Sequence, residues 1–222
     1  ESGPARASLG VTRYNAGSAF TERIRLAAGG GGDRVEWDVS ANWGTRETLL
    51  KVVFPLTATN PAATYDLGLG TIQRSNSTSS LYESPAQQWA DLTSTNGAFG
   101  VTIMNDSRYG WDKPDDRTLR LTVFHSPAVG SSYVYQATNG FGSHRLTFAV
   151  MGHTNDWRTG GSTQTRDGPA RPRRGETHHC RGHRVLAQPR VWHADADGHD
   201  RLLRDNRGAP QGHPARQAPH PA

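Results

Sequence analysis

The feature that most constrains the fold is a period-two alternation of apolar and polar residues that recurs along the first 150 residues. In its clearest run every second residue is apolar: Val35, Trp37, Val39, Ala41 and Trp43. Successive side chains of a β-strand point to opposite faces, so this pattern predicts a long strand with one buried face. No segment keeps the 3.6-residue period of an amphipathic helix over the length of a typical helix. The sequence therefore predicts an all-β domain.

Other strand patterns repeat at short intervals along the chain. Alternation returns at residues 8–12, 20–26, 99–103, 119–123 and 146–150, and residues 49–55 form the apolar run LLKVVFP. A further strand is expected over Tyr65, Leu67 and Leu69. Turn sequences such as AGGGGDR, residues 28–34, separate the runs, which favours an antiparallel β-sandwich. Three tryptophans occupy apolar positions in these patterns and are predicted to lie in the core: Trp37, Trp43 and Trp89.

The composition changes abruptly near Gln164. Residues 165–222 hold seven of the chain's 10 His, seven of its 13 Pro and 11 Arg, but only five residues among Val, Ile, Leu, Phe and Met. Such a segment buries too little apolar area to offset the entropy lost on ordering. We therefore divide the chain into a β-sandwich domain, residues 1–164, and a disordered Arg/Pro/His-rich tail, residues 165–222.

The tail has the composition expected when a GC-rich gene is translated in the wrong frame. We expect a frameshift near Gln164, which resequencing tests, because the correct frame should resume strand-like sequence. The alternative is a natural basic arm that binds polyanions. The cluster HHCRGH, residues 178–183, holds residue types that bind Zn²⁺. Because no apolar scaffold surrounds this cluster, we interpret it as incidental.

Charge follows the same division. The formal net charge is +5, but residues 1–164 carry 14 Lys plus Arg and 14 Asp plus Glu, so the excess belongs to the tail. We therefore expect no nucleic-acid partner for the sandwich.

No apolar run approaches membrane-spanning length, and no membrane partner is expected. The chain lacks an initiating Met and a signal-peptide pattern, so we expect a fragment of a longer protein. Its location is unknown from the sequence, with the cytoplasm favoured.

The segment 105–117, between two strand patterns, is the candidate binding site. Its polar and aromatic side chains can hydrogen-bond sugar hydroxyls or stack on a sugar's C–H face. The candidate substrate-binding residues are Asn105, Asp106, Arg108, Tyr109 and Trp111. Turns recruit the same residue types for their own geometry. In the alternative interpretation, Asp106 and Arg108 form a local ion pair while Tyr109 and Trp111 pack at a domain interface.

Five blocks, in this order, carry a resemblance to a known family: LLKVVFP, YDLGLGTIQRSNST, PAQQWADL, GVTIMNDSRYGWD and LRLTVFHSP. Together they resemble the C-terminal β-rich domain of the glycoside hydrolase family 38 α-mannosidases. The likeness covers residues 3–158 and ends with GHTNDWR, residues 152–158. It implies an antiparallel β-sandwich of the supersandwich, galactose-mutarotase-like type. It also implies that a loop of MNDSRYG type reaches toward the sugar-binding cleft.

Members of this family resemble retaining zinc glycosidases whose aspartate nucleophile and metal ligands lie in a separate N-terminal domain. No residue of this chain matches the nucleophile or a zinc ligand, so we assign no catalytic residue and no metal ligand here. Zinc and the α-mannoside substrate are expected to be partners of the parent enzyme, together with its catalytic domain. The resemblance implies a C-terminal α-mannosidase fragment that is inactive alone. The alternative is a free-standing carbohydrate-binding sandwich, which needs exposed aromatic rings on a concave sheet face.

Overall fold

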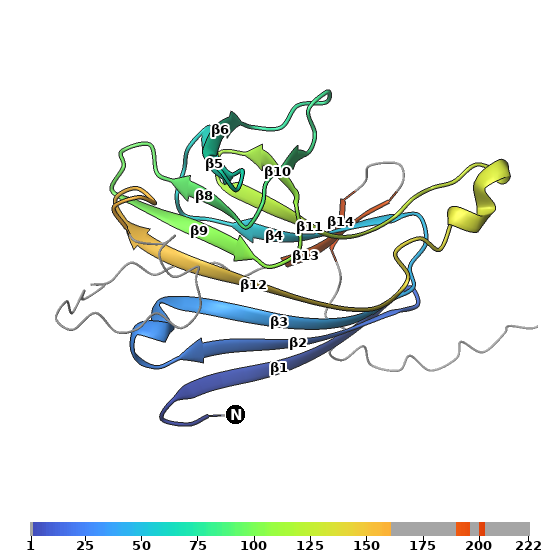
Figure 1. Ribbon diagram of the computed structural model, residues 1–222, viewed down its shortest axis with the longest axis horizontal. Coiled ribbons are helices and arrows are strands. Elements are labelled where there is room, and N and C mark those ends of the chain that lie inside the picture. Colours follow the sequence, from blue (N-terminus) through green and yellow to red (C-terminus); the bar gives the residue numbers. More distant parts are fainter. Residues whose placement is uncertain (1, 161–189, 196–199, 203–222) are drawn as a thin grey trace, which may run out of the picture.

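The computed structural model describes residues 2–160, 190–195 and 200–202, and these form two antiparallel sheets that pack face to face (Figure 1). In spatial order, the larger sheet consists of β1 (Arg6–Asn15), β2 (Ser18–Ala27), β3 (Arg34–Trp43), β12 (Gly142–Thr154), β9 (Phe99–Asn105), β8 (Trp89–Thr93), β5 (Ala62–Asp66) and β6 (Thr71–Ser75). The smaller sheet consists of β14 (Asp200–Leu202), β13 (Arg190–Asp195), β4 (Thr48–Pro55), β11 (Thr118–Ser126), β10 (Gly110–Asp115) and β7 (Ser84–Pro85).

Within these described ranges the only helices are two short 3₁₀ segments, η1 (Gly29–Asp33) and η2 (Ser131–Gln136). The prediction of an all-β antiparallel sandwich is therefore confirmed. None of the described helices is long and apolar enough to cross a membrane.

The core lies between the two sheets and is rich in aromatic rings. Trp43 of β3 stacks on Phe124 of β11 with ring centroids 5.1 Å apart, and Phe54 of β4 meets Phe148 of β12 edge-on at 5.8 Å. Such pairs add to the stabilisation from apolar burial. The three tryptophans predicted to lie in the core are all buried. The prediction is confirmed for Trp37 and Trp43, which belong to the core cluster, whereas Trp89 is buried against Trp157 on the outer face of the larger sheet.

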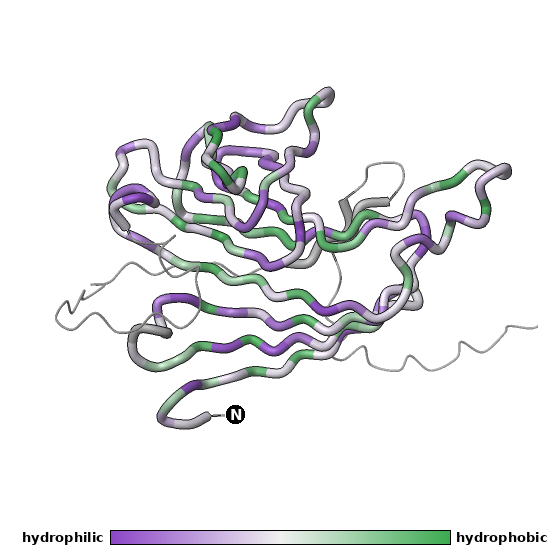
Figure 2. The backbone as a smooth tube through the Cα atoms, viewed as in Figure 1, coloured by the Kyte–Doolittle hydropathy of each residue, from purple (hydrophilic) through white to green (hydrophobic). Residues whose placement is uncertain are grey.

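The alternation seen in the sequence becomes a separation of two sheet faces. Along β3 the residues from Trp37 to Trp43 that face the core are buried, whereas Ser40 and Asn42 are exposed on the opposite, outer face. Figure 2 shows the same alternation of hydrophobic and hydrophilic residues along β2 and β3. The long register between β3 and β12, from Trp37↔Phe148 to Ala41↔His144, keeps both faces continuous across the pair.

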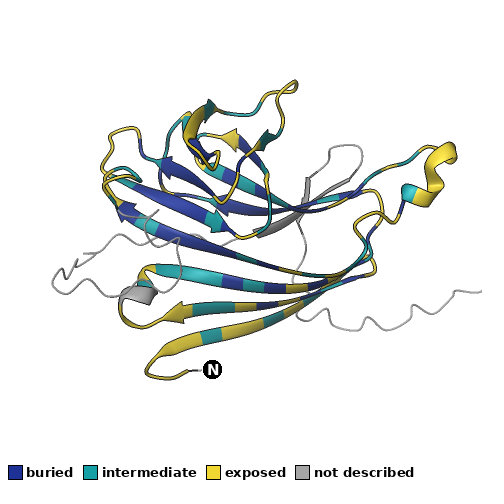
Figure 3. Cartoon of the chain, viewed as in Figure 1, coloured by how far each residue is buried: buried dark blue, intermediate teal, exposed yellow. Residues whose placement is uncertain are grey.

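Burial is uneven across the larger sheet. Its strands β8 and β9 are mostly buried, as are β4 and β11 of the smaller sheet, whereas β1 at the edge of the larger sheet has no buried residue (Figure 3). The burial gradient places the tightly packed part of the molecule around β8, β9 and β12, next to the candidate segment.

The structure corrects the strand predicted over Tyr65, Leu67 and Leu69. Strand β5 ends at Asp66, and the two leucines lie in an exposed turn. The Asp66 carboxylate accepts the Gly68 N–H at 2.9 Å, and Gly68 has a positive φ of 84° that glycine adopts without strain. Local turn chemistry therefore overrides the apolar alternation.

Two segments of the tail, which was expected to be disordered, are strands in the structure. Strand β13 pairs with β4 through Val191↔Val52, and β14 pairs with β13 through Trp192↔Leu202. Their backbones extend the smaller sheet, which composition did not indicate. The remaining tail residues, including the HHCRGH cluster and the expected frameshift position, lie outside the described residues.

Candidate functional site

The candidate segment is a crossover between the two sheets and not a hairpin loop. Strand β9 ends at Asn105 in the larger sheet, and β10 begins at Gly110 in the smaller sheet, where it pairs with β11. The prediction of one continuous loop over 105–117 is therefore corrected, because β10 occupies its centre. The connection between β9 and β10 is therefore only residues 106–109, and its polar groups fix a sharp change of direction.

Asn105 organises this crossover. Its side-chain oxygen accepts the N–H groups of Ser107 at 3.1 Å and Arg108 at 2.6 Å. Its amide Nδ2 donates to the Gln87 carbonyl oxygen at 3.3 Å. These bonds form an Asx-type turn anchored to the segment before β8, so the buried Asn105 side chain is committed to local structure.

Arg108 folds back over the smaller sheet. Its guanidinium lies 5.3 Å from the ring centre of Phe124, and its Nη1 donates to the Ser107 carbonyl oxygen at 2.9 Å. Burial lowers the pKa of Arg108, partly opposed by the nearby Asp106 carboxylate. The side chain therefore contributes a cation–π contact and a turn contact from a half-buried position.

Two of the candidate side chains are exposed at the crossover. Tyr109 is 55 % exposed, and Asp106 is exposed while its carboxylate accepts the Ser107 hydroxyl at 2.8 Å. The Asp106 N–H donates to the Thr147 carbonyl oxygen of β12 at 3.2 Å, which ties the crossover to the larger sheet. Asp106 and Tyr109 are the members of the candidate set that a ligand can reach.

Trp111 was expected among the substrate-binding residues, but it lies in the core. It lies in β10 with its side chain fully buried in the core, so it presents no ring face to solvent in this chain. Its register with Leu121 of β11 places it among the apolar residues of the smaller sheet. The sequence did not indicate that a strand begins at GWD, residues 110–112, because the Lys, Pro and Asp residues that follow disfavour a strand.

The aspartates that follow serve structural contacts. Asp112 is 2 % exposed and sits between Lys51 Nζ at 2.6 Å and Arg120 Nε at 2.5 Å. Asp115 accepts the Arg117 N–H at 2.8 Å, as expected for a turn, and the Asp116 carboxylate accepts the Asn76 amide at 2.6 Å. These carboxylates are therefore held by neighbours that neutralise or orient them.

A buried polar cluster on the outer face of the larger sheet was not predicted. The Asp91 carboxylate of β8 accepts His153 Nε2 of β12 at 2.7 Å, Thr102 Oγ1 of β9 at 2.7 Å and Thr93 Oγ1 at 2.6 Å. Burial alone would lower the pKa of His153, but the hydrogen bond and charge of Asp91 outweigh it and raise the pKa above its ordinary value of 6.5. The cluster joins three adjacent strands.

The segment after β12 covers this cluster. Trp157 packs on Trp89 with ring centroids 4.8 Å apart, and Arg158 lies 4.2 Å over the Trp157 ring. Asp156 accepts the N–H groups of Arg158 and Thr159 and so closes the turn. The segment GHTNDWR, residues 152–158, thus forms a structural cap. Its His153 side chain bonds Asp91 beneath the cap, and its Trp157 side chain packs over β8.

The described residues offer no metal site. No group of three or more His, Cys, Asp or Glu side chains in residues 2–160 is arranged to hold an ion. The zinc expected for the parent enzyme therefore finds no fitting ligand set in the described part of this chain.

The fold is an antiparallel β-sandwich of two sheets, and Asp106 and Tyr109 are the candidate side chains that it leaves exposed. Residues 1–129 match the Glycosyl hydrolases family 38 C-terminal domain, and the chain belongs to this family. It is 30% identical over 132 residues to Alpha-mannosidase 2C1 of Mus musculus, covering 57% of this chain. It is 28% identical over 117 residues to Alpha-mannosidase of Saccharomyces cerevisiae, covering 50% of this chain.

These matches involve a small share of the relatives. The chain spans 12% of the mouse protein and 10% of the yeast protein. Among solved structures, a Glycosyl Hydrolase Family 38 protein from Enterococcus faecalis superposes with a TM-score of 0.55 at 14% identity, covering 66% of this chain and 17% of that one. An alpha-mannosidase from Enterococcus faecalis V583 gives a TM-score of 0.53 at 16% identity, with the same coverage. These structures support the fold.

Proposed function

We propose that this chain serves as the C-terminal domain of an α-mannosidase that hydrolyses terminal α-mannosides, and that it has no catalytic activity alone. The observation that carries the proposal is the family match over residues 1–129 in a chain that spans 12% of the mouse α-mannosidase. In this proposal the aspartate nucleophile and the zinc site belong to a separate catalytic domain, against which the sandwich packs.

The carboxylates of the described residues support the absence of catalysis. A retaining glycosidase needs two carboxyl groups about 5 Å apart at the sugar, one as nucleophile and one as acid and base. Asp112 and Glu83 share Lys51 Nζ at 2.6 Å and 3.3 Å, but Asp112 is buried and Glu83 accepts the Thr122 hydroxyl. A substrate that displaced these partners would leave buried charges unpaired, which is costly.

The crossover between β9 and β10 is proposed to contribute to sugar contact through its exposed side chains. Asp106 would accept hydrogen bonds from sugar hydroxyls, and Tyr109 would offer a ring face to the sugar's C–H surface. Asn105 and Arg108 would hold the crossover in place, since their polar atoms already bond within it. In an enzyme carrying this domain, Asp106→Ala and Tyr109→Ala should raise KM while the denaturation midpoint stays unchanged.

The test of the proposal begins with the purified chain alone. The chain is incubated with 4-nitrophenyl α-D-mannopyranoside, with and without added Zn²⁺, and release of 4-nitrophenol is followed by absorbance. We expect no hydrolysis above the buffer rate in either condition. Turnover that follows the protein through purification and disappears on denaturation would refute the claim that catalysis lies elsewhere.

The alternative function, a free-standing carbohydrate-binding module, predicts exposed aromatic rings on a concave sheet face. Trp37, Trp43, Trp89 and Trp111 are instead buried. Titration of the chain with mannose and mannobiose distinguishes the two, since a free-standing module binds them without any catalytic partner.

A further inference from the structure

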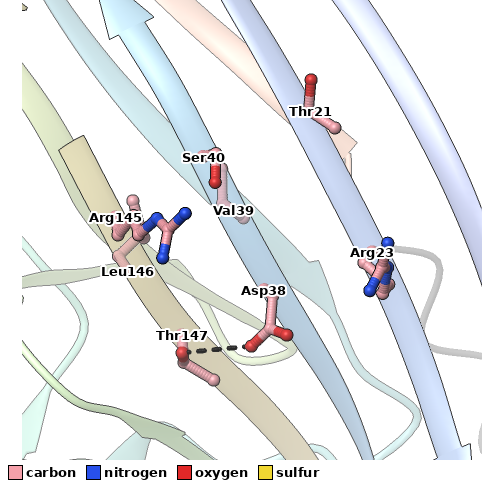
Figure 4. Close-up of a pocket in the computed structure, with 8 residues that line it drawn as sticks. All are labelled: Thr21, Arg23, Asp38, Val39, Ser40, Arg145, Leu146 and Thr147. Carbon is pink, nitrogen blue, oxygen red and sulfur yellow. Dashed lines mark hydrogen bonds between the residues drawn. The ribbon is translucent and has the colours of Figure 1, made fainter. Parts of the chain in front are cut away.

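A groove runs along the outer face of the larger sheet, away from the core and from the crossover side chains. It lies over β2, β3 and β12 and has a volume of about 440 Å³. The polar residues that line it are Thr21, Arg23, Asp38, Ser40, Arg145 and Thr147 (Figure 4). An adjoining lobe of about 570 Å³ shares three of these residues, and its further polar residues are Asn42, Ser143 and His144. Both lobes fall in the size range of small-molecule sites.

The strand register builds the groove from two rows of side chains. One row pairs Thr21 and Arg145 with Ser40 between them, and the next pairs Arg23 and Thr147 with Asp38 between them. Small polar residues of β3 therefore form the floor. The two arginines stand on the strands at either side. Their backbones are roughly 12 Å apart, because two strand spacings across the sheet and two residues along it separate them.

The charges of the groove do not balance. Asp38 is paired with Arg25, whose Nη2 lies 2.6 Å from its Oδ2, and it also accepts the Thr147 hydroxyl at 3.3 Å. Arg23 and Arg145 are exposed, and neither has an ion-pair partner in the part of the chain that the structure describes. Two positive charges are thus left facing the groove. Arginine prefers carboxylate and phosphate oxygens, which it can bind through two N–H groups.

We propose that this groove binds a hydroxylated small molecule that carries one anionic group, namely a sugar bearing a phosphate or a carboxylate. Arg23 and Arg145 bind the anionic oxygens. The hydroxyl and amide groups of Ser40, Asn42 and Ser143 bind the sugar hydroxyls. No Trp, Tyr or Phe side chain lines either lobe, so a neutral sugar gains no large stacking surface there. The site is independent of the proposed mannosidase role, because it shares no residue with the crossover.

The test is isothermal titration calorimetry of the full chain with four probes at low ionic strength. Glucose 6-phosphate and glucuronate represent the two anionic groups, glucose is the neutral sugar, and inorganic phosphate is the anion alone. We expect one or both anionic sugars to bind, phosphate to bind at least tenfold more weakly, and glucose not to bind. The stronger of the two anionic sugars identifies the group that the arginines recognise. Added salt should weaken binding because the charges are exposed.

Charge-removing variants locate the binding. Arg23→Gln and Arg145→Gln should each weaken binding by about tenfold, as expected for loss of one charge-assisted contact. The double variant should abolish it. Arg117→Gln is the matched control, since Arg117 is an exposed arginine in the turn between β10 and β11 of the other sheet. Circular dichroism checks that every variant folds.

Three results would overturn the proposal. The first is no binding of either anionic sugar. The second is equal binding of inorganic phosphate and the anionic sugars, which would leave the hydroxyl contacts without a role. The third is unchanged binding by the folded double variant, or an equal loss of binding in Arg117→Gln, either of which would show attraction to the general surface charge.

Discussion

The Asp91→Asn substitution probes the buried cluster that joins β8, β9 and β12. Asp91 is 1 % exposed and its carboxylate holds His153, Thr102 and Thr93. The amide that replaces it keeps the size but removes the charge and one acceptor. Removing one partner of a buried ion pair costs about 3–5 kcal/mol, and retention of some hydrogen bonds favours the lower end. We expect a loss of about 3 kcal/mol, or a fall in Tm of roughly 6–12 °C.

The stabilisation by the His153–Asp91 pair should depend on pH in a definite direction. The pKa of His153 in the folded chain lies above its ordinary value of 6.5, so the folded state binds the proton more tightly than the unfolded state does. The stabilisation is therefore complete below pH 6.5 and is lost as the pH rises through the raised pKa. In Asp91→Asn, burial without the carboxylate favours neutral His153, so the stability difference between the two proteins should be largest at low pH.

The assay is urea denaturation at pH 5.5, 7 and 8.5, followed by tryptophan fluorescence, because Trp89 and Trp157 pack beside the cluster. Asp106→Asn is the matched control, since it makes the same chemical change at an exposed carboxylate and should alter stability by less than about 0.5 kcal/mol. An Asp91→Asn protein as stable as the control, or a stability difference that grows with pH, would show that the buried ion pair does not act as described.

Substitutions at three further positions test the packing around the site. Gly100→Ala should destabilise the chain by about 1–3 kcal/mol in chemical denaturation, because a Cβ there would lie 2.5 Å from His153 Cε1 and 3.0 Å from the Thr93 backbone; wild-type stability would contradict this packing. Asn105→Ala should cost about 1–2 kcal/mol in the same assay by removing the acceptor of two backbone N–H groups, and an unchanged midpoint would show that the turn forms without it. Trp111→Ala should cost about 3–5 kcal/mol by leaving a cavity. Trp111→Phe should cost much less, since Trp111 Nε1 has no hydrogen-bond partner among the described residues, and equal losses in calorimetry would contradict the assignment.

Strand positions and core tryptophans were predictable because each depends on a local pattern. The alternation around Trp37 and Trp43 specifies which face of β3 is buried, whatever lies opposite. The turn at Leu67 and Leu69 was not predicted, because the apolar alternation there indicates a strand. Two glycines and the Asp66 carboxylate nevertheless favour turn geometry. Local signals therefore fail where two of them compete.

The candidate site depended more on long-range contacts. The sequence indicated a polar segment between two strands, but the strands belong to different sheets, which no local pattern reveals. That change of sheet takes Trp111 into the core and leaves Asp106 and Tyr109 outside. His153 and Asp91 are 62 residues apart in sequence, so their pairing follows only from the order of strands β8, β9 and β12.

We propose that this sandwich completes an α-mannosidase whose catalytic groups lie elsewhere. The most direct measurement replaces the matching segment of the mouse relative with residues 1–160 of this chain and determines kcat/KM for 4-nitrophenyl α-D-mannopyranoside. A deletion of the same segment and a replacement by an unrelated β-sandwich serve as controls. We expect activity in the replacement and none in either control. A folded replacement protein as inactive as the deletion would show that this sandwich does not serve as the mannosidase domain.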